Sequence, residues 1–300
     1  MNPNDFIHPD DAAALENLKA IPGFPQLLKK FMELGLEKLL YGENMAQCIR
    51  LSPKQLPKLY NHLPPICERL GIQEPEFYLQ MDPNPNAWTF GDTQIFITMT
   101  SGLVEMMSPE ELDAVIAHEC GHILCHHVLY HTMAHFLLSG VDFIPFFGSL
   151  LTLPLKYAFL YWERKSEISC DRAAAVVTSP DIVASTMARL AGGPLGLTKE
   201  VNFEEWAKQA DEYEKIYNAN MLNKTLQTYA VMNQSHPFAA VRVREILKWS
   251  RSSQFRKCGG VAKLVASGAS SAGRKCPQCG KPLGDAALFC PHCGLVLQSP

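Results

Sequence analysis

The sequence predicts a mainly α-helical domain with a small β-sheet (α+β), followed by a small separate module at the C-terminus. Three observations support this fold class. Apolar residues recur every three to four positions through most of the chain, which is the helical period. Two short runs, 76–81 and 93–99, combine aromatic and β-branched residues as strands do. A stretch rich in Gly, Ala and Ser, residues 259–273, precedes a set of paired cysteines.

Composition limits the class of protein. With 47% hydrophobic residues among 300, the chain can bury a large core. The formal net charge is only -3, without a long run of one sign, so the charge gives no support to nucleic-acid binding. Residues 1–5 lack the basic start and apolar core of an export signal, so we expect a cytoplasmic location. The cysteines without a disulfide-type spacing agree with this location: Cys48, Cys67, Cys120, Cys125, Cys170 and Cys258.

Residues 1–50 are predicted to form a helical segment. Between 12 and 48 the apolar residues fit one or two amphipathic helices, interrupted at the proline- and glycine-containing stretch 21–25. We interpret these helices as core or cover. A further helix at 56–70 is loosened by its prolines, and the two strands follow it, joined by a proline-rich turn at 82–92.

A well-marked helix begins after Ser108. Ser108 fits the N-cap, Pro109 the first helical position and Glu111 the third, which completes a capping box. Apolar residues then follow at helical spacing: Leu112, Val115, Ile116, Ile123 and Leu124. A buried helix of this kind is a rigid support for functional side chains.

The middle of this helix carries the pattern H-E-x-x-H. His118 and His122 are four residues apart, so both imidazoles project from one face and can bind one zinc ion. Glu119 lies beside the coordination position that a catalytic zinc keeps open. Two protein ligands are not enough for such a site, so a third must come from elsewhere in the chain.

More histidines follow the motif. If the same helix continues through 125–135, then His127, His131 and His135 lie on a face roughly opposite the pair, where packing explains them better than metal binding. A longer zinc-protease pattern, which needs Gly at position 125 and His at 128, is excluded because Cys125 and Val128 stand there.

Residues 136–162 are the most apolar stretch. They are long enough to cross a bilayer, but polar residues, prolines and a glycine interrupt them: Asp142, Pro145, Gly148, Pro154 and Lys156. We therefore favour a hydrophobic hairpin or loop between two helices, which shields the site or makes peripheral membrane contact, over a true span.

The next helix offers the missing ligand. Glu167 and Asp171 are four residues apart, on one face, among apolar and small residues. Two buried carboxylates are costly without partners. A metal site removes this cost, because Glu167 completes a His-His-Glu ligand set and Asp171 accepts the second ring N–H of a ligand histidine. The alternative is a surface pair bound to Arg164 or Lys165.

With these residues in place the chain resembles the H-E-x-x-H zinc metallopeptidases of the HtpX and CAAX prenyl protease type, metallopeptidase family forty-eight, a gluzincin group. The E-x-x-x-D motif of that family matches Glu167 to Asp171. Further matches are Asn86-Ala87, Ser101-Gly102-Leu103, and His236-Pro237 with Arg242 beyond it. The resemblance covers residues 51–249.

The resemblance implies roles for individual residues. It assigns zinc to His118, His122 and Glu167, with Glu119 as the general base. It also brings His236 to the active site as a catalytic donor to the oxyanion, although His236 can equally serve only to cap the helix at 238–249. Arg242 is expected to pair with a site carboxylate.

The segment before the second strand is a candidate substrate site. In a zinc peptidase, an extended peptide can pair with an exposed strand close to the metal helix. We assign this role to residues 86–90, and to Asn86, Ala87 and Trp88 in particular. An ordinary hairpin connection explains the same segment equally well.

The C-terminal half ends in a second metal signal. Helices are expected at 181–190, 203–233 and 238–249, before the flexible linker. Two C-P-x-C-G knuckles then supply four thiolates for a structural zinc in a zinc-ribbon: Cys276, Cys279, Cys290 and Cys293. With few basic residues nearby, we expect this module to dock a protein or recruit a substrate rather than to bind nucleic acid.

The sequence therefore predicts a zinc-dependent metalloendopeptidase with one catalytic and one structural Zn²⁺, acting on protein or peptide substrates. The expected parts are an N-terminal helical segment (1–50), a gluzincin metallopeptidase domain (51–252), a flexible linker (253–274) and a zinc-ribbon (275–300). One alternative is a catalytically silent, zinc-stabilised adaptor or chaperone-like protein that acts through the ribbon. Another is a zinc hydrolase of non-peptide substrates.

Overall fold

The structure is a computed structural model that describes residues 1–138, 153–221, 223, 238–260 and 277. The chain divides into two compact units, Met1–Lys263 and Leu264–Pro300, and the described helices and strands all belong to the first. This unit is mainly helical with one small sheet, so the predicted fold class is confirmed.

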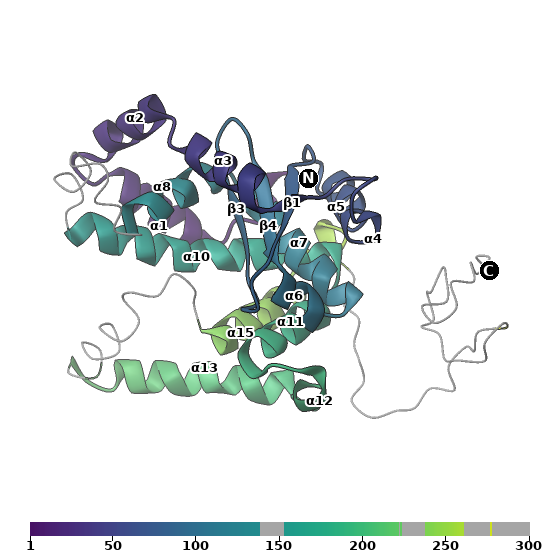
Figure 1. Cartoon of the computed structure of the whole chain (residues 1–300). Coiled ribbons are helices and arrows are strands. Elements are labelled where there is room, and N and C mark those ends of the chain that lie inside the picture. Colours follow the sequence, from purple (N-terminus) through teal and green to yellow (C-terminus); the bar gives the residue numbers. More distant parts are fainter. Residues whose placement is uncertain (139–152, 222, 224–237, 261–276, 278–300) are drawn as a thin grey trace. The chain divides into compact units, whose positions relative to one another are not determined.

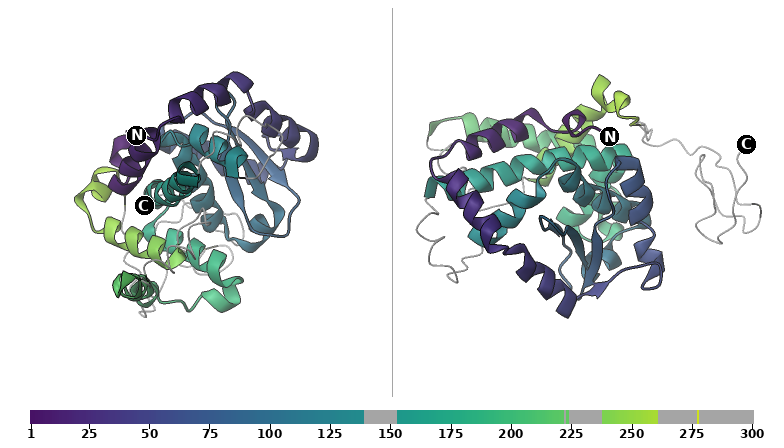
Figure 2. Two further views of the ribbon diagram at one scale, coloured as in Figure 1. Left: turned by 90° about the vertical axis from the view of Figure 1, so that its left-hand side faces the viewer. Right: turned by 90° about the horizontal axis from the view of Figure 1, so that it is seen from above.

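Helix α10 (Leu153–Val177) runs through the middle of the first unit. The N-terminal helices and the sheet lie on one side of it, and α11 (Pro180–Gly192), α13 (Phe203–Asn218) and α15 (Ala239–Ser250) lie on the other (Figures 1 and 2). The remaining helices are η1 (Pro3–Asp5), α1 (Pro9–Lys19), α2 (Phe24–Leu34), α3 (Glu37–Gln47), α4 (Pro57–Tyr60), α5 (Leu63–Leu70), α6 (Ser101–Met106), α7 (Pro109–Leu124), α8 (Val128–Leu138), α12 (Leu195–Thr198) and α16 (Ser253–Lys257).

The sheet has four strands in the order β1-β2-β4-β3. The two predicted strands are β2 (Glu76–Gln80) and β4 (Phe96–Thr100), which pair in parallel. The two-residue strand β1 (Ile49–Arg50) was not predicted, and β3 (Ala87–Phe90) pairs antiparallel with β4. Among the described strands β3 lies at the edge of the sheet, and it packs against α7, the helix that carries the H-E-x-x-H residues.

Helix α7 begins as predicted and packs closely on α10. The Ser108 hydroxyl accepts a hydrogen bond from the Glu111 backbone N–H, and the Glu111 carboxylate accepts one from the Ser108 backbone N–H, so the capping box is present. At Gly121 a Cβ atom would lie 2.9 Å from Cys170 Cα and 3.2 Å from Ala173 Cβ. The absence of a side chain at Gly121 therefore lets the two helix backbones approach each other.

Helix α7 does not continue through 125–135 as predicted. His126 has a φ of 59°, in the left-handed region. The His127 N–H donates to the His122 carbonyl at 2.9 Å, and the His126 N–H to the Ile123 carbonyl at 3.1 Å. This pair of bonds is the Schellman ending of a helix. The chain turns here, and α8 starts in a new direction at Val128.

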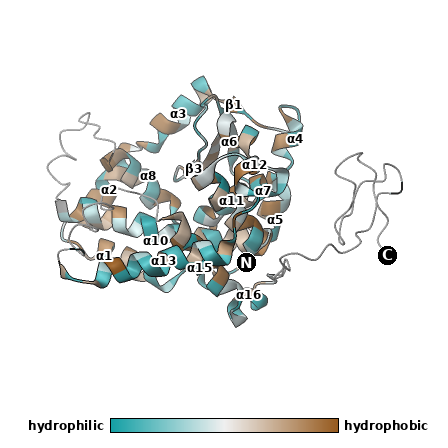
Figure 3. Ribbon diagram, turned by 90° about the horizontal axis from the view of Figure 1, so that it is seen from below, coloured by the Kyte–Doolittle hydropathy of each residue, from teal (hydrophilic) through white to brown (hydrophobic). Residues whose placement is uncertain are grey.

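Three groups of buried apolar residues stabilise the unit. One lies between the sheet, α5, α7 and α10, a second between α1, α2, α8 and α10, and a third between α11, α13 and α15. Helix α13 is hydrophilic along most of its length (Figure 3), and of its residues only Ala207 and Ala210 are buried. The described helix is therefore solvated, as predicted, but it ends at Asn218 and does not run on to 233; residues 224–233 lie outside the described residues.

Two predictions about flanking segments meet the structure only in part. Helix α16 occupies the first five residues assigned to the linker, with Phe255 fully buried, so these residues belong to the first folded unit. The predicted hairpin within 136–162 falls mainly on residues 139–152, outside the described residues. Among the residues described, no helix combines the length and apolar character needed to cross a membrane.

Candidate metal centre

The H-E-x-x-H residues of α7 and the two carboxylates of α10 meet in the buried interior. The Glu167 carboxylate lies between the imidazoles: Oε2 is 3.4 Å from His118 Nε2, and Oε1 is 3.4 Å from His122 Nε2. These side chains are at most 11% exposed. Two imidazoles and one carboxylate, aimed at a common point, are the donor set of a catalytic zinc site, so these residues fit the metal.

Asp171 holds the other ring nitrogen of His118. Its Oδ1 is 3.0 Å from His118 Nδ1. A carboxylate at this position fixes the proton on Nδ1 and leaves the Nε2 lone pair free for a metal. Asp171 is 1% exposed, so it needs a cationic partner as well.

Arg242 of α15 is that partner. Its Nε donates to Asp171 Oδ2 at 2.8 Å and its Nη2 to Oδ1 at 2.6 Å, while Nη1 lies 3.1 Å from Glu167 Oε2. The bidentate contact outweighs the effect of burial and lowers the pKa of Asp171. Both carboxylates of α10 are thus held in place from a third helix.

The carboxylates give the centre a strong preference for positive charge. Burial by itself lowers the pKa of His118, but Glu167 and Asp171 outweigh burial and raise that pKa to about 10. Burial lowers the pKa of His122 well below its usual value, so this imidazole is neutral, as a metal ligand must be. A cation between the two rings would satisfy the same negative charges.

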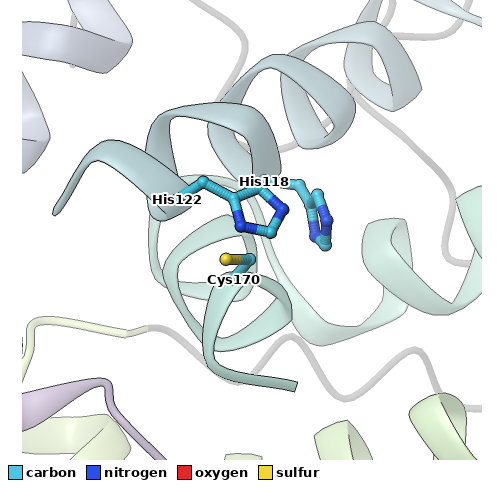
Figure 4. A group of neighbouring side chains, drawn as sticks. All are labelled: His118, His122 and Cys170. Carbon is cyan, nitrogen blue, oxygen red and sulfur yellow. The ribbon is translucent and has the colours of Figure 1, made fainter. Parts of the chain in front are cut away.

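Cys170 is a rival third ligand that the sequence did not suggest. One ligand atom from each of His118, His122 and Cys170 lies within 4.8 Å of the others. In Figure 4, however, the sulfur of Cys170 is turned away from His118, and its described contact is His127 Nδ1 at 3.6 Å. Each oxygen of Glu167 lies near the Nε2 atom of one of the two histidines, whereas the sulfur of Cys170 is turned away from His118. The geometry therefore favours Glu167 as the third ligand.

Glu119 is held by a residue that the sequence did not indicate. The Thr89 hydroxyl, on β3, donates to Glu119 Oε2 at 2.7 Å. Burial raises the pKa of Glu119 above its usual value, and the bond from Thr89 opposes part of that rise. The edge strand therefore orients the carboxylate of the motif.

A cavity of about 710 Å³ opens over these residues. Its lining includes His118, Glu119 and Glu167 of the centre, and Asn86, Ala87, Trp88, Thr89 and Phe90 at and before β3. Helix α3 contributes Leu40, Glu43, Asn44 and Gln47. The N-terminal segment, predicted only as core or cover, thus forms part of the cavity wall.

The later histidines lie beside the motif rather than opposite it. Because the chain turns at His126, the ring centroids of His127 and His131 are 5.6 Å and 4.5 Å from that of His122. The prediction that they occupy an opposite face was wrong, since it assumed one continuous helix. A left-handed residue was not signalled, because His rather than Gly or Asn stands at position 126.

Several predicted site residues cannot be located. His236 lies outside the described residues, and so do the four ribbon cysteines: Cys276, Cys279, Cys290 and Cys293. The described residues of the centre all belong to the first unit.

Comparisons with known proteins show which families the sequence matches. The sequence model of Peptidase family M48 matches residues 53–250, and that of a zinc-ribbon domain matches 272–297. The chain is 33% identical over 259 residues to the plastoglobule-localized metallopeptidase 48 of Arabidopsis thaliana, covering 85% of this chain and 75% of that one. It is 26% identical over 185 residues to a protease HtpX homolog of Tropheryma whipplei (strain Twist), covering 52% of this chain and 64% of the relative. The crystal structure of S. mikatae Ste24p overlaps loosely, with a TM-score of 0.38 and 15% identity over 77% of this chain and 64% of that one.

Proposed function

The chain belongs to peptidase family M48 and is a zinc metalloprotease with a C-terminal zinc-ribbon, and we propose that it is an endopeptidase whose catalytic zinc is held by His118, His122 and Glu167. The observation that carries this ligand set is the Glu167 carboxylate, with one oxygen 3.4 Å from each of the two Nε2 atoms. Asp171 and Arg242 support it, because they orient His118 and Glu167 from behind.

The proposed mechanism assigns the proton transfers to Glu119. Zinc held by His118, His122 and Glu167 would supply Lewis acidity, which would polarise a scissile carbonyl and lower the pKa of a water molecule. Glu119 takes a proton from that water and later passes it to the leaving amine. Burial raises the pKa of Glu119 above its usual value, which makes the carboxylate a better proton acceptor. The Thr89 hydroxyl keeps the carboxylate in one orientation throughout.

The proposed substrate is an extended stretch of polypeptide. One edge of β3 pairs with β4, and the other borders the cavity above Glu119. A peptide laid along that edge would satisfy its backbone groups by strand pairing, with Asn86, Ala87 and Trp88 as its neighbours. The scissile bond would then pass over the histidines and the base.

The zinc-ribbon is proposed to hold a second, structural zinc. The matched region includes Cys276, Cys279, Cys290 and Cys293, and four thiolates form a closed tetrahedral set that leaves no position for a substrate. A module of this size depends on its metal to fold. We propose that it docks a protein or recruits substrates.

The test of the endopeptidase proposal is Glu119→Gln. This variant keeps the ligand set, so it should bind as much zinc as the wild type while cleavage of casein falls to background. Glu110→Gln, an exposed change on the same helix, is the matched control and should cleave normally. Casein cleavage by Glu119→Gln at the wild-type rate would refute the assignment of the base. A wild-type chain that binds zinc and cleaves nothing would favour the silent adaptor.

A further inference from the structure

We propose that Asp11, on the N-terminal helix α1, is a positioning residue for the catalytic metal and acts through His127 to fix the ring proton of His122. The inference rests on the proposed function, because it takes His122 Nε2 as a zinc ligand. Asp11 lies outside the matched family region 53–250, and the chain brings it to the centre across more than a hundred residues.

The Asp11 carboxylate is buried and accepts three hydrogen bonds. The Trp162 Nε1–H donates to Oδ1 at 3.0 Å, and the Ser169 hydroxyl donates to Oδ2 at 2.6 Å. His127 Nε2 lies 3.0 Å from the same Oδ2. Asp11 and His127 are each 1% exposed. An ionised carboxylate can only accept, so the proton of His127 must be on Nε2.

The position of this proton determines whether the other ring nitrogen of His127, Nδ1, donates or accepts a hydrogen bond. In a neutral imidazole with a proton on Nε2, Nδ1 is an acceptor. His127 Nδ1 lies 3.4 Å from His122 Nδ1. Two acceptors cannot face each other, so His122 carries its proton on Nδ1 and donates it to His127. The His122 Nε2 lone pair then points towards Glu167, where the zinc is proposed.

Cys170 competes for the same nitrogen. Its Sγ is 3.6 Å from His127 Nδ1, so the thiol can also donate there. A thiol is a weak donor. Whichever group donates, His127 Nδ1 must be unprotonated to accept, so the proton of His127 remains on Nε2.

The two ligand histidines are thus oriented by different routes. Asp171 holds His118 directly, from the helix that carries Glu167. Asp11 holds His122 through an intervening imidazole, from the N-terminal segment. The left-handed turn at His126 is what brings His127 back beside His122.

The experiment compares zinc affinities of the full-length chain by competition with a chromophoric chelator. Asp11→Asn places an amide where only an acceptor fits, and His127→Phe removes both nitrogens. Each should weaken zinc binding at the catalytic site about 10- to 100-fold, the usual effect of losing such a partner. His127→Gln retains a donor and an acceptor, so it should recover most of the affinity. Cobalt substitution separates the two metal sites, because cobalt bound to thiolates has intense sulfur charge-transfer bands that a histidine–carboxylate site lacks.

Trp162→Phe is the matched control. It removes a different hydrogen bond to the same carboxylate, leaves the contact between Asp11 and His127, and keeps an aromatic ring against the His127 imidazole. Its zinc affinity should therefore match the wild type even if its melting temperature falls. Thermal unfolding of the zinc-free variants shows that each is folded. If Asp11→Asn does not fold, the two His127 variants decide the question.

Three results would overturn the inference. These are wild-type affinity in both Asp11→Asn and His127→Phe, equal losses in His127→Phe and His127→Gln, or a loss in Trp162→Phe as large as that in Asp11→Asn. None of them depends on cleavage. A wild-type chain without peptidase activity would contradict the proposed function while the affinity series still tested the role of Asp11.

Discussion

At the residue scale, the proposed general base Glu119 accepts a hydrogen bond from a hydroxyl of the edge strand β3. Thr89→Val keeps the shape of the side chain and removes the 2.7 Å bond to Glu119 Oε2. A hydrogen bond to a charged group contributes about 1.5–3 kcal/mol, so we expect kcat for a peptide substrate to fall about 10- to 100-fold. Zinc content should not change.

The control for this prediction is Thr93→Val. Thr93 donates to Glu37 on the surface and has no contact with the motif, so the variant should cleave at the wild-type rate. If Thr89→Val also cleaved at that rate, the hydroxyl would have no part in orienting Glu119.

The charge of Asp11 predicts how stability depends on pH. Burial raises the pKa of Asp11, but hydrogen bonds from His127, Ser169 and Trp162 outweigh it and lower the pKa below its unfolded value. A lowered carboxyl pKa stabilises the fold above the unfolded pKa of about 4, and this contribution is lost as the pH falls through the folded value.

Asp11→Asn should therefore have a lower free energy of unfolding than the wild type at pH 7. This difference between the two proteins should disappear as the pH is lowered. The deficit at neutral pH is expected to be about 1–3 kcal/mol, for a buried group whose donors lose their acceptor. Urea unfolding of the zinc-free proteins, at steps from pH 7 down to about 3, measures it. A deficit that stayed constant over this range would mean that the ionised form of Asp11 contributes no stability.

At the scale of elements, the close contact between α7 and α10 brings the proposed zinc ligands together. A Cβ atom at Gly121 would lie 2.9 Å from the Cys170 backbone, so Gly121→Ala must push the helices apart or distort one of them. We expect a loss of about 1–3 kcal/mol in stability from overpacking, and weaker zinc binding because Glu167 moves away from the imidazoles. Chelator competition and thermal unfolding measure the two effects.

Gly42 provides the matched control for this substitution. It lies inside α3, and a Cβ atom there would meet nothing within 4 Å. Gly42→Ala should stabilise the chain by up to about 1 kcal/mol and leave zinc binding unchanged. Equal zinc affinity in Gly121→Ala and Gly42→Ala would show that α7 and α10 need not approach so closely.

Elements whose signals are local were predictable from the sequence. The capping box at Ser108 gave the start of α7, and the aromatic and β-branched runs gave β2 and β4. The end of α7 was not predictable, because its left-handed residue is His126, which carries no local signal for that conformation. Because this turn was not predicted, His127 and His131 were expected on the face opposite His122, whereas they lie beside it.

At the scale of the whole molecule, the contacts that could not be predicted are those between residues far apart in the sequence. The spacing of His118, His122, Glu167 and Asp171 on two helices indicated a shared site, because each pair is local to its own helix. The contacts of Asp11 with Trp162 and Ser169 join residues more than 150 positions apart. Local sequence patterns do not predict contacts between residues so far apart in the chain. The contribution of the N-terminal segment to the site therefore became visible only in the structure.

The two units of the chain allow the roles of the two proposed zinc sites to be separated. The proposed catalytic residues and their supports, from Asp11 to Arg242, all precede Lys263, where the first unit ends. A chain that stops at Lys263 should therefore bind one zinc instead of two and cleave a short peptide as fast as the full-length protein. Changing Cys276 and Cys279 to Ser in the full-length chain should give the same stoichiometry and peptide activity.

If the ribbon recruits substrates, both variants should be slower only on folded or large proteins, because a short peptide does not need recruitment. Loss of peptide cleavage in both variants would instead make the ribbon a part of the catalytic unit.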